Sequence, residues 1–165
     1  MSGQAMHSLT RRTWLAGLTV AGALNRFAIA DERPHPPALP VPESLADALA
    51  SALNRHQPLV VMVSLEGCPF CRVARENYLY PLYRREGLPV VQIDMRLERP
   101  VRDFGQAATT HDALIRSWGV RVAPTLLFFG AQGNEVAERL NGAAIADFYG
   151  AYLDQRLEVA RSHIQ

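Results

Sequence analysis

The sequence predicts one α/β domain, because its length allows a single core and its apolar residues alternate between helical and strand spacing. The chain has 165 residues, enough for one domain of ordinary size and too few for two. Leu45 to about Arg55 has apolar residues at helical spacing, and Ser44 can cap this helix. The next apolar run, Leu59–Val63, is continuous and rich in β-branched residues, as in a strand covered on both faces. Helical spacing then returns, at Cys71, Ala74, Tyr78 and Leu82.

Composition and charge exclude several classes of protein. Apolar residues make up 48% of the chain and charged residues 20%, which is typical of a globular domain and not of a disordered or fibrous chain. The formal net charge is only +1. The chain therefore lacks the basic excess typical of nucleic-acid binding, and we expect no nucleic-acid partner.

The first 30 residues are predicted to be an export signal. Arg11 and Arg12 precede a mild apolar stretch, Trp14–Leu24, and the triplet Ala28–Ala30 follows as a cleavage site. The arginine pair resembles a twin-arginine signal, while the general secretion route stays open. The 11-residue apolar stretch is shorter than the roughly 20 residues of a spanning helix, so we expect no permanent membrane anchor. We therefore expect a periplasmic protein cleaved near Ala30; the alternative is a helix belonging to the fold.

Residues 31–43 are predicted to be a tether between the signal and the domain. Five prolines favour extended geometry here and prevent a helix: Pro34, Pro36, Pro37, Pro40 and Pro42. The domain itself is then expected to occupy residues 44–165.

The two cysteines lie where the predicted strand gives way to a helix, in the motif Cys68-Pro69-Phe70-Cys71. If Pro69 is the first helical residue, Cys68 caps the helix and faces the positive end of its dipole, which favours a thiolate. A thiolate is the species that attacks a disulfide, so we predict that Cys68 is the nucleophile. Cys71 lies one turn along the same helical face, where it can resolve the mixed disulfide.

A cysteine pair at this spacing has other uses besides redox chemistry. A structural disulfide across so short a loop would stabilise the fold little. Zinc requires four ligands, and the five histidines are not spaced as pairs, so we predict no metal site of that kind. Cu(I) needs only two sulfur ligands, so a copper-binding metallochaperone remains the alternative from another functional class.

A segment in the second half of the chain makes the sequence similar to a known family. In residues 118–129, the step Ala123-Pro124-Thr125 leads into an apolar run. This segment resembles the part of thioredoxins that enters a strand through a cis-proline. Together with the cysteine motif, it gives the sequence a resemblance to the thioredoxin superfamily over about residues 45–161.

The resemblance implies a substrate-binding surface around the cysteine motif. Pro124 would lie as a cis-proline against the cysteine pair, and the backbone at Ala123 would pair with an extended substrate segment. Pro69 and Phe70, between the cysteines, would border this surface. Phe70 would be exposed there and could contact a partner.

The same resemblance predicts a thioredoxin fold, with a central mixed four-stranded sheet built from a β-α-β unit and a β-β-α unit and flanked by helices. The helix before the first strand is an extra N-terminal element. The expected order after it is strand 59–64, helix 69–86, strand 90–94, helix 112–118, strand 125–129, strand 135–140 and helix 145–161. Gly87 is expected to end the second helix.

Two residues in this region depart from the thioredoxin pattern. Met62 stands where thioredoxins carry a buried aspartate, so the usual internal proton acceptor is missing. Glu66 is the nearest acid that could take a proton from Cys71, with a solvated loop carboxylate as the alternative. In the position of Pro81, the sequence resembles bacterial periplasmic thioredoxin-like reductases, including sulfur-oxidation-associated ones. This proline is expected to bend the helix.

The stretch Arg96–Thr109 is a third departure, because it is longer than a typical connection. We interpret it as a solvated insertion, with a partner-facing loop beside the site as the alternative. His111 is interpreted as a solvated residue at a helix start and Trp118 as a core residue. Neither is assigned chemistry.

The motif favours a disulfide reductase. Pro69 and Phe70 are uncharged and Glu66 opposes a thiolate, so the strong thiolate stabilisation that makes a disulfide oxidising is not expected. We predict that the protein reduces disulfides of exported partner proteins. With no flavin or haem motif in the chain, we expect no cofactor and predict recharging by a membrane thiol electron donor. A disulfide oxidase or isomerase is the alternative.

Overall fold

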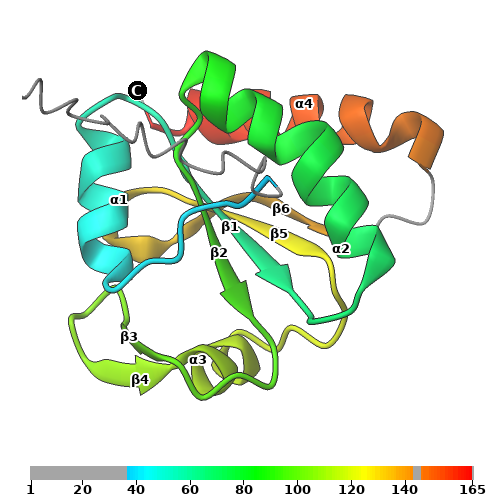
Figure 1. The fold of residues 1–165 in the computed structure, drawn as a ribbon. Coiled ribbons are helices and arrows are strands. Elements are labelled where there is room, and N and C mark those ends of the chain that lie inside the picture. The colour runs from blue at the N-terminus through cyan, green and yellow to red at the C-terminus, as the bar shows by residue number, and fades with distance from the viewer. Residues whose placement is uncertain (1–36, 143–145, 165) are drawn as a thin grey trace, which may run out of the picture. The chain divides into compact units, whose positions relative to one another are not determined.

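A mixed four-stranded sheet forms the centre of the fold (Figure 1). The computed structural model describes residues 37–142 and 146–164. The strands lie in the order β2-β1-β5-β6, with β1 and β2 parallel and the other neighbours antiparallel. Their bounds are Leu59–Ser64 (β1), Val90–Asp94 (β2), Thr125–Phe129 (β5) and Glu135–Asn141 (β6). The predicted sheet is confirmed, and β6 is one residue longer than expected.

Helices cover both faces of this sheet, and each face has its own buried cluster (Figure 1). The helices bounding one face are α2 (Pro69–Val73), its continuation and α4 (Ala146–Ser162); those on the other are α1 (Leu45–Leu53) and α3 (His111–Ser117). Met62 points into the first cluster and Val61 into the second. All six residues of β1 are buried because side chains on both of its faces are covered. This explains why β1 reads as a continuous apolar run.

The first helix begins where the sequence predicts. The Ser44 side chain accepts a hydrogen bond from the Asp47 N–H at 3.1 Å and so caps α1. The helix ends at Leu53, two residues before the expected end. A short 3-10 turn, η3 (Ala131–Gly133), joins β5 to β6.

The helix after β1 spans residues 69–86, as predicted, but most of it is not α-helical. After α2, the segments η1 (Ala74–Leu79) and η2 (Leu82–Glu86) are π-helical, a geometry in which N–H groups donate to carbonyls five residues back. Pro81 lies between these two segments. Gly87 ends the helix in the left-handed conformation (φ 68°), which glycine adopts without strain.

The stretch 96–109 is not a simple solvated insertion, which corrects the sequence interpretation. It runs into an antiparallel hairpin of two strands, β3 (Pro100–Arg102) and β4 (Ala108–Thr110). Val101 is buried in the core. The Phe104 ring packs on those of Trp118 and Phe129, with centroids 6.2 Å and 4.6 Å away. The hairpin therefore covers part of the core, because aromatic packing and a buried valine hold it there.

His111 is buried rather than solvated, which is a second correction. Thr110 caps α3 instead, accepting a hydrogen bond from the Ala113 N–H. The His111 ring is fully buried, and its Nδ1 accepts a hydrogen bond from the Asp94 N–H at 3.1 Å. The neutral ring thus links the end of β2 to α3. Burial lowers the pKa of His111 below its usual value of 6.5. The nearby Asp94 carboxylate raises this pKa by a smaller amount, and the charge of Arg99 lowers it.

The described part of the predicted tether, residues 37–43, contacts the domain. Leu39 is buried, and the Gln92 N–H donates to the Pro40 carbonyl at 2.8 Å. The predicted export signal, with its cleavage near Ala30, and the first part of the tether lie outside the described residues. In the ranges that the structure describes, no helix combines the length and apolar character needed to cross a membrane.

The buried His111 is expected to make stability depend on pH. Its folded-state pKa lies below the unfolded value of 6.5, so below that pH the unfolded chain binds a proton that the folded domain excludes. The free energy of unfolding should therefore fall as the pH is lowered from about 7 toward about 5. Urea unfolding across this range measures the slope. The His111→Asn variant is the control, because its amide oxygen can accept from Asp94 without titrating; equal slopes in the two proteins would contradict the assignment.

Candidate active site

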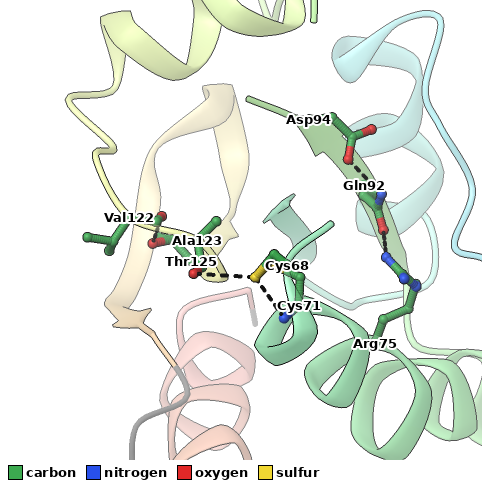
Figure 2. The surroundings of a disulfide bond; sticks show 8 residues. All are labelled: Cys68, Cys71, Arg75, Gln92, Asp94, Val122, Ala123 and Thr125. Atoms are coloured by element: carbon green, nitrogen blue, oxygen red, sulfur yellow. Dashed lines mark hydrogen bonds between the residues drawn. A yellow bond between two sulfur atoms is a disulfide. The ribbon is translucent and has the colours of Figure 1, made fainter. Parts of the chain in front are cut away.

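Cys68 and Cys71 form a disulfide at the start of the helix that follows β1 (Figure 2). As predicted, Cys68 is the N-cap and Pro69 is the first helical residue. The Cys71 N–H donates to the Cys68 Sγ at 3.1 Å, so this sulfur satisfies one of the free N–H groups of the helix start. Cys68 is half-buried, whereas Cys71 is only 1% exposed. The first sulfur is therefore the one open to a substrate.

The Ala123-Pro124 peptide lies beside Cys68, as the resemblance implies. This peptide bond is cis, and the Ala123 carbonyl oxygen lies 3.8 Å from the Cys68 Sγ (Figure 2). Pro124 is buried, and its carbonyl accepts a hydrogen bond from the Gly142 N–H at 2.7 Å. The turn is thus anchored to the end of β6 while its Ala123 side faces the sulfur.

Exposed apolar side chains border the cysteine motif and the turn. Phe70 is 58% exposed and Val122, directly before Ala123, is 51% exposed. The Val122 carbonyl accepts a hydrogen bond from the Thr125 hydroxyl at 2.9 Å, which fixes the backbone of the turn (Figure 2). Large apolar side chains left in solvent beside a reactive group favour contact with a partner protein.

A cavity of about 930 Å³ lies next to the disulfide. Its walls come from the carboxyl ends of β1 and β2, the start of the helix after β1 and the loop after β2. Both cysteines line it, and so do five charged residues: Glu66, Arg72, Arg75, Asp94 and Arg96. Figure 2 shows Arg75 and Asp94 on the opposite side of Cys68 from Ala123. The sulfur therefore lies between the cis-proline turn and a charged cavity.

Hydrogen bonds order the polar wall of this cavity. The Arg75 Nη1 donates to the Gln92 Oε1 at 3.0 Å, and the Gln92 Nε2 donates to the Asp94 Oδ1 at 2.8 Å (Figure 2). The Gln92 amide thus stands between the guanidinium and the carboxylate. Asp94 is held further by the bond from its N–H to His111.

Within the described ranges, no acidic side chain is buried beside Cys71. Met62, fully buried, belongs to the same apolar cluster as Cys71. Tyr149 also belongs to it, but burial, with a smaller effect of Tyr78, raises the pKa of its hydroxyl, which stays protonated and cannot accept the proton. Glu66 lines the cavity but is exposed, so its role in proton transfer stays a prediction.

Among the described residues that line the cavity, three carry sulfur, a soft metal ligand: Cys68, Cys71 and Met95. The two cysteine sulfurs are bonded to each other in this structure. In the part of the chain that the structure describes, no three His, Cys, Asp or Glu side chains are grouped to hold a metal ion. Metal binding at the motif would therefore require the reduced pair.

Arg75, Gln92 and Asp94 are site residues that the sequence prediction did not include. Two signals point to them. Arg75 follows Cys71 by four residues, which places both on one side of a helix. Asp94 ends a strand parallel to β1, and the carboxyl ends of parallel strands share one edge of a sheet.

Comparison with known proteins agrees with this geometry. A family model described as a thioredoxin-like domain matches residues 45–157. The chain belongs to this thioredoxin-like family. With its Cys68–Cys71 disulfide inside the matched residues, this thioredoxin-like protein is a thiol–disulfide oxidoreductase. No curated protein matches the chain by sequence.

Solved structures are similar to this chain at low sequence identity. A DsbH oxidoreductase is 20% identical, with a TM-score of 0.50 over 81% of this chain and 92% of that one. The C-terminal domain of Neisseria meningitidis DsbD, oxidised, is 21% identical, with a TM-score of 0.47 over 68% of this chain and 92% of that one. The periplasmic thioredoxin SoxS from Paracoccus pantotrophus, reduced, is 23% identical, with a TM-score of 0.41 over 63% and 99%. At these identities the similarity concerns the fold alone.

The unequal burial of the two sulfurs predicts unequal reactivity. After reduction, iodoacetamide should alkylate Cys68 about tenfold or more faster than Cys71, because only Cys68 is open to solvent. Mass spectrometry of the proteolysed protein at short reaction times locates the label. The Cys68→Ser variant should be labelled slowly in its native state and rapidly in urea. Equal labelling of both cysteines in the native protein would contradict this order.

Proposed function

We propose that the protein reduces disulfides of exported partner proteins, with Cys68 as the nucleophile and Cys71 as the resolving thiol. The position of Cys68 carries this proposal: the sulfur is half-buried at a helix start, 3.8 Å from the carbonyl beside the cis-proline. Cys71 is buried next to it, with 5.3 Å between the two Cα atoms. One sulfur can meet a substrate while the other stays inside.

The reaction is a two-electron exchange in two steps. The Cys68 thiolate attacks one sulfur of the substrate disulfide, a mixed disulfide between Cys68 and the substrate forms as the substrate S–S bond breaks, and the departing thiolate takes a proton from solvent. The Cys71 thiol then gives its proton to solvent, and its sulfur attacks the Cys68 Sγ of the mixed disulfide. This step forms the Cys68–Cys71 disulfide and releases the second substrate thiolate. The substrate disulfide is reduced to two thiols, and the cysteine pair is oxidised.

Two features favour the Cys68 thiolate during this exchange. The Cys71 N–H, which lies 3.1 Å from the Cys68 Sγ, can donate to the sulfur whether it is a disulfide or a thiolate. The helix dipole adds positive potential at the same point. Pro69 and Phe70 add no charge, and the cavity lining holds two acids that offset two of its three arginines. The net stabilisation is therefore modest, which supports a reductant rather than a strong oxidant.

The turn at Ala123 and Pro124 is the proposed binding site for the substrate backbone. An extended segment laid along it would pair with the backbone of Ala123, in the manner of an added strand. Pro69, Phe70 and Val122 would border that segment with apolar contacts. Such contacts align the substrate sulfur with Cys68 before the exchange.

Export and recharging complete the proposal. Arg11 and Arg12 with the following apolar stretch support export, and a cycle outside the cytoplasm needs electrons from elsewhere. A membrane protein with a reduced cysteine pair is the proposed donor. It would reduce the Cys68–Cys71 disulfide by the same two-step exchange in the opposite direction.

The function is tested with insulin as a protein disulfide. The reduced chain should reduce it, and Cys68→Ser should abolish the reaction because the attacking sulfur is lost. Cys71→Ser should stop after one step, leaving insulin chains covalently linked at Cys68, which intact-protein mass spectrometry detects. A variant without Cys68 that kept full activity would defeat the proposal.

The reduction potential of the Cys68–Cys71 pair decides the direction. Equilibration with glutathione buffers should give a value nearer to thioredoxin, about −270 mV, than to strong disulfide donors, about −120 mV. A value close to the second would assign the protein to disulfide formation instead.

Phe70 is expected to contact protein substrates. Phe70→Ala should lower insulin turnover about three- to tenfold, because a 58% exposed aromatic side chain at the motif loses its contact surface. Turnover of bis(2-hydroxyethyl) disulfide, which is too small to use that surface, should not change. Val159→Ala, which removes an exposed side chain from α4, is the matched control. Unchanged insulin turnover in Phe70→Ala would remove Phe70 from the partner surface.

A further inference from the structure

Three arginines on the cavity wall have no acidic partner. Arg72, Arg75 and Arg96 line the cavity beside the disulfide. Four arginines of the described ranges form ion pairs with carboxylates, namely Arg102, Arg116, Arg139 and Arg156, while several outside the cavity, such as Arg84, form none within these ranges. The cavity arginines differ from the latter in that they line one cavity together. Within the same ranges, none of the cavity arginines forms such a pair. Their charges are therefore open to a ligand.

The guanidinium of Arg75 is hydrogen-bonded to a neutral side chain, the amide of Gln92. Arg75 is half-buried, and its Nη1 donates to the Gln92 carbonyl oxygen at 3.0 Å. This bond orients the guanidinium without neutralising it and leaves its other N–H groups for a further acceptor. Arg72 lies three residues earlier on the same helix, directly after Cys71. The two guanidinium groups therefore start from one side of the helix that carries the cysteines.

Two acids face the same cavity and weaken its positive potential. Glu66 is exposed in the loop before Cys68. Asp94 accepts a hydrogen bond from Gln92, whose amide separates it from Arg75. Three arginines against two acids leave the wall net positive, while the disulfide itself carries no charge.

We propose that this cavity is a subsite for carboxylate groups that flank the substrate cysteine, so that the preferred partner carries an acidic segment at its disulfide. This rests on the proposed function, since it concerns the substrate of the same cysteines. The volume of about 930 Å³ accommodates several side chains, and the lining includes Met95 and Leu97, which suit their aliphatic parts. A guanidinium pairs well with a carboxylate because its parallel N–H groups match the two oxygens.

The test uses three peptides that differ only in charge. Gly-Xaa-Cys-Xaa-Gly, with Xaa as Glu, Gln or Lys, is oxidised to its disulfide-linked dimer, and the reduced full chain is mixed with each dimer. Arginines beside Cys68 also act on its thiolate, which affects the rates on all three dimers alike, so the readout is the ratio of two rate constants. Arg72→Gln, Arg75→Gln and Arg96→Gln should each lower the ratio of the Glu-dimer rate to the Gln-dimer rate about two- to fivefold, and should raise or leave unchanged the ratio of the Lys-dimer rate to the Gln-dimer rate. Since the peptides differ as leaving groups, the ratios of each variant are compared with those of the original chain.

Two controls separate a charge effect from a general one. Arg84→Gln, an exposed arginine of η2 outside the cavity lining, should not change any of the three rates. Added salt should shrink the effect of the cavity variants on the Glu dimer, because it screens the pairing. A uniform change on all three dimers, or an unchanged ratio of the Glu-dimer rate to the Gln-dimer rate, would overturn the subsite. Failure of the original chain to reduce even the Gln dimer would count against the proposed function itself.

Discussion

The antiparallel pairing of β1 with β5 is the interaction on which the site depends. Val63, near the end of β1, lies opposite Thr125, the first residue of β5. This register places the start of the cysteine helix and the Ala123-Pro124 turn at the same edge of the sheet. Two segments 55 residues apart in sequence thus meet at one sulfur. Since both faces of β1 are buried, a shift of one residue would exchange its side chains between the two cores, placing Met62 where Val61 packs. The close packing of the two cores therefore favours the observed register.

The parallel pairing of β1 with β2 builds the other half of the site. Ser64 lies opposite Asp94, so both strands end at the cavity. Asp94 is then held from two directions, by Gln92 from its own strand and by the buried His111 of α3. His111 has its pKa lowered by burial and serves here as a neutral acceptor, which makes it part of the support of the cavity wall rather than of the chemistry.

Local signals in the sequence were sufficient for most of the fold. Ser44 as a cap, Gly87 as a stop and the apolar run of β1 each act through near neighbours, and all three were predicted. The hairpin that covers the core was missed because each of its strands has three residues and its packing rests on contacts of Phe104 with distant rings. His111 was misjudged for a similar reason: its burial depends on a hydrogen bond from Asp94, 17 residues away.

The candidate site divides in the same way. The cysteine motif and the cis-proline are sequence patterns, and both lie where they were expected. The charged cavity depends on where β2 ends relative to β1, which no local pattern records. The sequence alone shows that Met62 stands where a buried acid would be. Only the structure shows that Tyr149 lies in the same cluster, where burial raises the pKa of its hydroxyl and keeps it from acting as a base instead.

The surroundings of Cys68 suggest how one sulfur can meet two different parts of a substrate. A disulfide joins two arms, and attack by a thiolate proceeds along the line of the breaking S–S bond, so the attacked and the departing sulfur face different surroundings. At Cys68 the turn with Val122 offers backbone groups and apolar contact, whereas the cavity with Arg75 offers charge. In the proposed complex, a partner segment lying along the turn would continue beyond its cysteine toward the arginines. Apolar contact and charge would then act on the same partner from opposite sides of the reacting sulfur.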